Sequence, residues 1–156
     1  MVPKKESDVT KIVPSRQAVY FFREKSFIEK NPEVRPHYHI ALPVSDNNYV
    51  ILACIQTKYW VIEKHHKLAG IEDAIVYIRK EELANGELGF LTESISAIDC
   101  AQVKMMTYNQ LKSEVVDGFK IYKTNIPQAM YSEIIAKTKN VKTIRSRIKK
   151  VLDDAL

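Results

Sequence analysis

Residues 35 to 57, RPHYHIALPVSDNNYVILACIQT, predict the central element of the fold. The runs HYHIALPV (37–44) and YVILACIQT (49–57) are rich in β-branched and aromatic residues, as strands are, and the polar SDNN between them favours a tight turn. We therefore expect a β-hairpin. With SDNN at its tip, such a hairpin brings Arg35, before the first strand, close to Thr57, at the end of the second.

Short strand candidates surround this hairpin, whereas helix candidates collect toward the end of the chain. Further strands are predicted at 17–22, 74–78, 94–99 and 102–106. The segment 23–34 carries Asn31-Pro32 among charged residues and is typical of a loop with one helical turn at most, and 58–73 is ambiguous. Many short strands without alternating long helices predict an α+β fold, a small β-barrel or a strongly bent antiparallel sheet with C-terminal helices.

The helical signals lie after residue 106. Thr107 and Gln110 have the spacing of a capping box, Gly118 suits a helix end, and Pro127 suits the first position of a further helix. Beyond it an apolar stripe recurs at helical spacing: Met130, Ile134, Val141, Ile144, Ile148 and Val151. The segment 137–150 also holds seven Lys and Arg residues and no acid. We divide the chain into a flexible arm (1–16), a β-rich domain (17–118) and a helical appendage packed on it (119–156).

Length and composition narrow the class of protein. The chain has 156 residues, two cysteines and a formal charge of +5, which suits one globular core with a modest preference for a polyanionic partner. No apolar run approaches the roughly 18 residues that cross a bilayer, and the first residues lack the apolar stretch of a secretory signal. We expect a cytoplasmic protein with reduced thiols and no membrane contact. The four glycines form no nucleotide-binding loop, which argues against nucleotide-dependent catalysis.

The open end of the hairpin has the residue types of a phosphate site. An Arg fork beside the hydroxyl of Thr57 can hold a phosphate and stabilise the extra charge of its transition state, although polar residues also flank strands for purely structural reasons. His37 and His39 point the same way on a strand and could shuttle a proton or bind metal. No zinc-type spacing completes them, even with the adjacent His65-His66, so we expect no metal and no cofactor.

Basic, aromatic and amide side chains near these elements are candidates for binding RNA. Aromatic residues can stack on unpaired bases, and cations of the terminal helix can contact phosphates, although packing and ordinary solvation explain both equally well. Asp99 and Gln102 flank Cys100 between two strand candidates, where side chains could reach a groove or simply make a turn. The candidate RNA-binding residues are Lys58, Tyr59, Gln102, Lys142 and Arg145.

The order of these pieces resembles the MazF/PemK-type toxin superfamily, whose members are small SH3-like barrels that cut single-stranded RNA. The resemblance spans about residues 17 to 117 and rests on AVYFF, a charged loop, Arg35-Pro36 before an apolar strand, a strand ending in Ile55-Gln56-Thr57, and SISAIDCAQVKMMTYNQL. It implies an SH3-like barrel with Arg35 and Thr57 at catalytic positions. The family's Gly-Asp opening is missing here, and Lys58 stands where a second hydroxyl residue often follows.

The resemblance also implies a reaction, a metal-independent attack of a ribose 2′-OH that leaves a cyclic phosphate and a 5′-OH. Arg35 would serve as acid or charge stabiliser, Thr57 would position the phosphate, and His37 or His39 would carry the proton. The expected protein is a toxin-type endoribonuclease, a homodimer held by a cognate protein or RNA antitoxin. The alternatives are a non-catalytic module of the same barrel class that binds nucleic acid or protein, and a histidine-dependent phosphoesterase.

Overall fold

A single antiparallel sheet organises the residues that the computed structural model describes, which are 18–46, 48–71, 73–84, 86–115, 119–123 and 126–154. Its strands are β1 (Ala18–Phe22), β2 (His37–Ala41), β3 (Tyr49–Gln56), β4 (Ile75–Arg79), β5 (Ile95–Asp99), β6 (Lys104–Thr107) and β7 (Lys120–Lys123). The strand order is β4-β5-β3-β2-β1-β7, and β6 pairs with β3. The predicted hairpin is confirmed, because β2 and β3 pair antiparallel with Tyr38 opposite Ile55 and His39 opposite Cys54.

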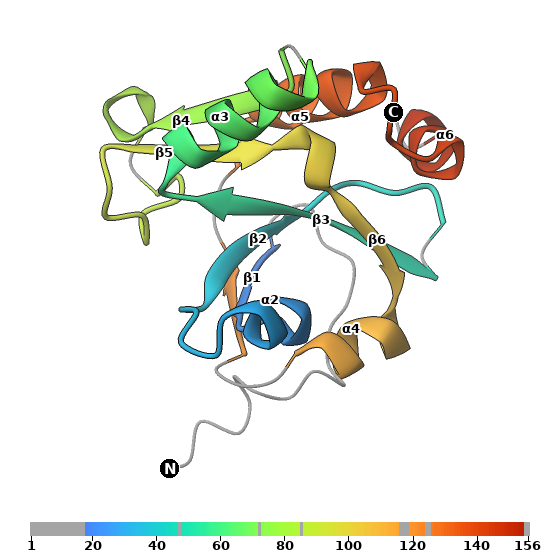
Figure 1. The fold of residues 1–156 in the computed structure, drawn as a ribbon, viewed down its shortest axis with the longest axis horizontal. Helices are drawn as coiled ribbons and strands as arrows, with labels where there is room; N and C mark the ends of the chain where they lie inside the picture. Colours follow the sequence, from blue (N-terminus) through green and yellow to red (C-terminus); the bar gives the residue numbers. More distant parts are fainter. Residues whose placement is uncertain are drawn as a thin grey trace.

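The bend of the sheet centres on β3, the longest strand. Its last residues, Ile55 and Gln56, pair with β5, whereas its first residues, from Tyr49 to Leu52, pair with β6. A short 3-10 helix, η3 (Cys100–Gln102), joins β5 to β6, so the two strands pair with successive parts of the same edge of β3, both antiparallel to it (Figure 1). Among the described residues the outer strands β4 and β7 do not pair with each other, so the sheet is strongly bent but is not a closed barrel.

Helices cover both faces of the sheet. They are α2 (Lys25–Lys30), α3 (Tyr59–Ala69), α4 (Tyr108–Glu114), α5 (Gln128–Asn140) and α6 (Ser146–Asp154), with a further 3-10 turn, η2 (Lys80–Glu82). Figure 1 shows α5 and α6 on one side of the sheet and α2 and α4 on the other. The two helices of the second side lie together, since the backbone nitrogen of Ser26 donates to Oε1 of Glu114 at 2.9 Å.

Alternation along the strands sorts side chains into two cores. One face carries Val19, Ile40 and Ala53, which pack with the buried residues of α5 and α6. The opposite face carries Tyr20 and Phe22, and its cluster is closed by residues that include Leu111 of α4. Because successive strand residues point to opposite faces, His37 and His39 share the second face, as do Cys54 and Gln56.

Several local predictions are confirmed in the helices. Thr107 and Gln110 form the capping box of α4, with the Gln110 backbone nitrogen 3.1 Å from Oγ1 of Thr107. A helix does follow Pro127, but Pro127 is the N-cap of α5 rather than its first residue. The segment 58–73, which the sequence left ambiguous, contains α3, whose C-cap Gly70 has the left-handed conformation (φ 69°). The prediction that Gly118 ends the capped helix is wrong, because α4 already ends at Glu114 with Val115 as its C-cap. Gly118 itself lies outside the described residues.

Two features of the C-terminal segment were not predicted. Residues 120–123 form β7, which pairs antiparallel with β1 and extends the sheet. The apolar stripe is divided between α5 and α6, because residues 141–145 turn between them, although Val141, Ile144, Ile148 and Val151 are all buried as the stripe indicated. No helix in the described part of the chain is long and apolar enough to cross a membrane.

Candidate functional site

The open end of the β2–β3 hairpin forms a surface hollow that contains both Arg35 and Thr57. The hollow has a volume of about 490 Å³ and is lined by residues that include Glu33, Arg35, His37, Gln56, Thr57 and Lys58; it is called the Arg35 hollow below. Its walls come from the segment before β2 and from the end of β3, which the antiparallel register places side by side. The volume falls within the roughly 300–1,000 Å³ of ligand sites.

The segment that carries Arg35 is held by Arg23, which follows β1. Nε of Arg23 donates to the carbonyl oxygen of Val34 at 3.1 Å, and Nη2 donates to the carbonyl oxygen of Pro32 at 2.9 Å. The side chain of Asn31 adds a local turn, since its Oδ1 accepts from the backbone nitrogen of Glu33 at 3.1 Å. The backbone on the N-terminal side of Arg35 is therefore fixed to the sheet, while the side chain of Arg35 is exposed.

Charge in the Arg35 hollow is mixed with a positive excess. Arg35 and Lys58 are both exposed cations, and Glu33 is the exposed acid among the lining residues. Thr57 adds a hydroxyl and Gln56 an amide, groups that can both donate to phosphate oxygens. Two cations against one acid favour an anionic ligand, and the guanidinium fork suits the paired oxygens of a phosphate.

His37 is the titratable base of the hollow. It is half-buried, and its ring lies edge-on to Phe27, with centroids 5.4 Å apart. Burial lowers the pKa of His37 below its ordinary 6.5, nearby His39 lowers it further, and Glu24 opposes them with a smaller effect. The imidazole is therefore neutral near pH 7 and can accept a proton.

His39 does not line the Arg35 hollow, so the prediction that it could carry the proton in place of His37 is wrong. Its side chain is buried, stacks on Phe22 with centroids 4.2 Å apart, and places Nε2 2.5 Å from Oε1 of Glu24. Its other ring nitrogen, Nδ1, lies 3.3 Å from the carbonyl oxygen of Tyr20. The prediction that both histidines share a face holds, but β2 carries His39 inward, where α2 and α4 cover it.

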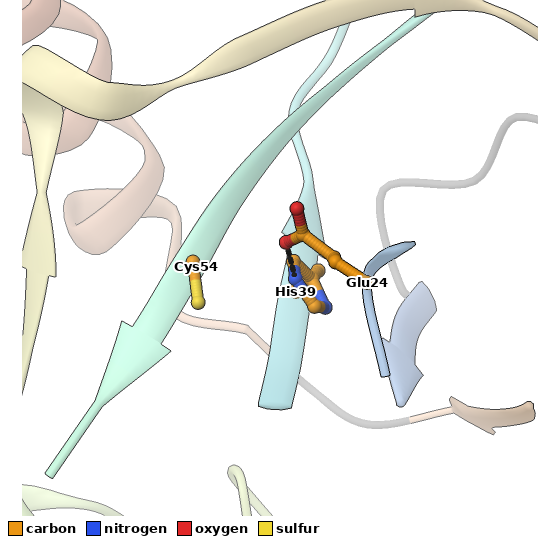
Figure 2. A group of neighbouring side chains, drawn as sticks. All are labelled: Glu24, His39 and Cys54. Atoms are coloured by element: carbon orange, nitrogen blue, oxygen red, sulfur yellow. Dashed lines mark hydrogen bonds and ion pairs between the residues drawn. The ribbon is translucent and has the colours of Figure 1, made fainter. Parts of the chain in front are cut away.

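Glu24 is the centre of a buried polar network that no pattern in the sequence indicated. Its second oxygen pairs with Nζ of Lys104, and the thiol of Cys54 lies beside the pair formed with His39 (Figure 2). Burial alone would raise the pKa of Glu24, but hydrogen bonds and charge from His39 and Lys104 outweigh it and hold the pKa at about 2. Burial raises the pKa of the Cys54 thiol well above its ordinary value.

Of the residues predicted to bind RNA, Lys58 lines the Arg35 hollow and the other four do not. Tyr59 contacts the rings of Trp60 and Tyr77 at the start of α3. Gln102 is exposed at the end of η3. Lys142 and Arg145 lie in the turn between α5 and α6 and border two different hollows, one beside the end of α3 and one beside β6.

The remaining histidines lie on α3. His65 is exposed, whereas His66 is buried and its Nε2 is 2.7 Å from Oδ1 of Asp99. Asp99 also accepts from the backbone nitrogen of Ala101 at 3.0 Å, so the turn explanation for Asp99 is confirmed. The pair sits at the edge of a cavity of about 390 Å³ lined by Glu63, Tyr77 and Lys137, among others. Lys137 is itself engaged there, since its Nζ donates to the carbonyl oxygen of Ile75 at 2.8 Å.

Comparison with known proteins adds no relative to this picture. No protein-family model, curated protein or solved structure matches the chain. The chemistry of the described residues therefore carries the functional argument.

Proposed function

We propose that the protein is an endoribonuclease that cleaves single-stranded RNA at the Arg35 hollow without a metal ion. The observation that carries the proposal is that Arg35, His37, Thr57 and Lys58 line one open hollow. These four residues supply a guanidinium fork, a neutral base, a hydroxyl and a second cation. Cleavage of a phosphodiester by the adjacent ribose hydroxyl requires groups of these kinds.

The reaction follows from the roles that these groups can fill. His37 takes the proton of the ribose 2′-OH, the 2′-oxygen forms a bond to the adjacent phosphorus, and the bond from phosphorus to the 5′-oxygen breaks. The departing 5′-oxygen takes a proton from water, so the products are a 2′,3′-cyclic phosphate and a 5′-OH. Arg35 serves as charge stabiliser rather than acid, because a guanidinium does not give up its proton in proteins.

Thr57 and Lys58 orient the substrate. The hydroxyl of Thr57 donates to a phosphate oxygen, and the ammonium of Lys58, on the adjacent residue, attracts the next phosphate along the strand. Glu33 faces the same hollow and opposes phosphate binding, which leaves one net positive charge among its lining cations and acid. The resulting attraction is modest, so we expect recognition to depend on the fork of Arg35 more than on bulk charge.

The biological setting is part of the same proposal. A metal-independent ribonuclease of this size would be harmful to its own cell, which fits a toxin held by a cognate protein or RNA antitoxin. We place it in the cytoplasm, where single-stranded RNA is available, and expect it to act as a homodimer, as the resemblance to MazF/PemK-type toxins implies.

The experiment is cleavage of a mixed single-stranded RNA by purified protein in EDTA, followed by identification of the fragment ends. Cyclic-phosphate and 5′-OH ends are expected, and Arg35→Ala should reduce the rate by about 10²–10³-fold. The matched control is Arg79→Ala, since Arg79 is an exposed arginine of β4 that lies over the ring of Tyr77 and not in the hollow. Its rate should be unchanged.

Three outcomes would contradict the proposal. Intact RNA after prolonged incubation with folded protein would show that the hollow is not catalytic, and binding of RNA without cleavage would identify a non-catalytic nucleic-acid module. Cleavage that requires an added divalent ion would instead favour the histidine-dependent phosphoesterase.

A further inference from the structure

The buried network around Glu24 brings together three side chains that can bind a transition metal. Glu24, His39 and Cys54 each offer one ligand atom, and these atoms all lie within 4.8 Å of one another. His39 and Cys54 are direct cross-strand partners on β2 and β3, and Glu24 reaches them from the segment between β1 and α2 (Figure 2). Carboxylate, imidazole and thiolate are the three common zinc ligands of proteins.

The orientation of His39 is that of a metal ligand. Nδ1 faces the carbonyl oxygen of Tyr20 at 3.3 Å, and a carbonyl can only accept, so Nδ1 carries the hydrogen. Nε2 then faces the oxygen of Glu24. Histidines that bind metals almost always donate from the second ring nitrogen to a backbone carbonyl or carboxylate, because this fixes both the tautomer and the ring plane.

We infer that Glu24 Oε1, His39 Nε2 and Cys54 Sγ form a binding site for a divalent metal of the zinc class. A thiolate and an imidazole select zinc or cobalt over the hard cations Mg²⁺ and Ca²⁺, which take oxygen ligands. Bond lengths of about 2.0 to 2.3 Å in a tetrahedral site separate the ligand atoms by about 3.3 to 3.7 Å. Nε2 and Oε1 are 2.5 Å apart without an ion, so these two atoms must separate by about 1 Å to take one up.

Binding exchanges protons for the metal. The ion takes the place of the hydrogen between His39 and Glu24, and the thiol of Cys54 releases its proton on forming the metal bond. No electron transfer takes place. The three protein donors leave a fourth tetrahedral position for an exogenous ligand.

Lys104 is the cation that competes with a metal for Glu24. Its Nζ holds the other oxygen of Glu24 and lies 4.6 Å from the ring centroid of Phe27, and its side chain is 37% exposed, unlike the buried Glu24 and His39. The ammonium of Lys104 and a bound metal would both place positive charge beside the carboxylate of Glu24. A bound metal therefore repels Lys104 toward solvent, and Lys104→Met should tighten metal binding.

The site is separate from the proposed chemistry of the hollow. His39 and Cys54 lie two residues along β2 and β3 from His37 and Gln56, on the same face of the sheet. Neither of them, nor Glu24, lines the Arg35 hollow, so the metal would not contact RNA there. Metal binding and RNA cleavage can therefore fail independently, and different assays measure them.

The test uses the full chain without an affinity tag, loaded first with Zn²⁺ and then with Co²⁺. We expect Zn²⁺, but not Mg²⁺, to raise the midpoint of thermal unfolding, and Co²⁺ to give a thiolate-to-cobalt charge-transfer band with one ion bound per chain. Cys54→Ala should abolish the band and weaken Zn²⁺ binding by at least about tenfold. The matched control is Cys100→Ala, which removes the other thiol, buried at the start of η3, and should keep the band.

Measurements on the unaltered protein decide the outcome even if a variant does not fold. If Zn²⁺ does not change the unfolding midpoint of the folded protein and Co²⁺ gives no band, then Glu24, His39 and Cys54 do not bind a metal. Glu24 and His39 then form only a buried ion pair. A band that persists in Cys54→Ala places the metal on the thiolate of Cys100, the other cysteine, and overturns the assignment. If the unaltered protein binds cobalt but does not cleave RNA, the result counts against the proposed function and not against the metal site.

Discussion

Nε of Arg23 donates to the carbonyl oxygen of Val34 at 3.1 Å and so anchors the residue directly before Arg35. A second bond, from Nη2 to the carbonyl oxygen of Pro32, completes a clamp on the segment that enters β2. The clamp comes from the end of β1, the neighbouring strand, so the position of the Arg35 backbone is tied to the sheet itself.

Loss of this clamp should impair cleavage more than it impairs folding. Arg23→Ala frees the segment before Arg35, and because small displacements of a catalytic group are costly, we expect kcat/KM to fall by about 10- to 100-fold. Arg23→Lys, which can reach one of the two carbonyls, should restore part of kcat. The measurements are steady-state kinetics on a short RNA and thermal unfolding. An unchanged rate in Arg23→Ala would show that the segment is held by other contacts.

Lys58 and Lys142 lie at different hollows, and this difference predicts how salt affects RNA binding. Lys58 lines the Arg35 hollow and Lys142 does not, although both are exposed lysines. For an oligonucleotide that fills only this hollow, Lys58→Ala should reduce the slope of log affinity against log salt by about 1, whereas Lys142→Ala should leave it unchanged. Titrations at several salt concentrations measure both slopes. Equal effects of the two substitutions would mean that RNA extends over the α5–α6 turn.

The pH dependence of cleavage should report the neutral form of His37. Burial and His39 lower its pKa, against a smaller effect of Glu24, and the hollow adds the cations Arg35 and Lys58 and the acid Glu33 around it. A base works when deprotonated, so kcat/KM should fall with acidification, and the midpoint of the fall should lie below the ordinary 6.5.

The profile is measured in EDTA, so that no metal alters the charge near His39. His37→Gln should remove this acidic limb along with most of the rate, while His65→Gln, at an exposed histidine of α3, should change neither. A midpoint above 6.5 would contradict a base that burial holds neutral.

Glu24 should make stability depend on pH at the acid end. The pKa of Glu24 is lowered from 4.5 to about 2 in the folded protein. The stability that the ionised carboxylate contributes is therefore complete above pH 4.5 and is lost as the pH falls toward 2. A shift of this size corresponds to roughly 3 kcal/mol. Glu24→Gln should therefore lower the free energy of unfolding by roughly that amount at pH 7 in EDTA, and the difference from the unaltered protein should shrink toward pH 2.

Denaturant unfolding at several pH values measures this difference. Glu93→Gln makes the same change at an exposed carboxylate and should alter stability by less than about 0.5 kcal/mol at any pH. A constant difference between Glu24→Gln and the unaltered protein from pH 7 to pH 2 would show that packing, rather than charge, is lost in the variant.

Local sequence patterns were sufficient where neighbouring residues decide the backbone. The β2–β3 hairpin follows from two β-branched runs joined by a polar turn, and the start of α4 follows from Thr107 and Gln110, which bond to each other within one helical turn. The convergence of Arg35 and Thr57 on one hollow is a consequence of the same hairpin, because antiparallel pairing places the start of one strand beside the end of the other.

The sequence by itself therefore determined the hairpin, the start of α4 and the residue types at the hairpin's open end, since each depends on contacts within a few residues. Only the tertiary structure decided that His39 turns inward to Glu24 and Lys104 while His37 stays at the hollow, and that β7 joins β1. Those outcomes depend on how the bent sheet brings distant segments together beneath α2 and α4. No local pattern encodes that packing, because burial and charge pairing are settled only when the whole sheet has formed.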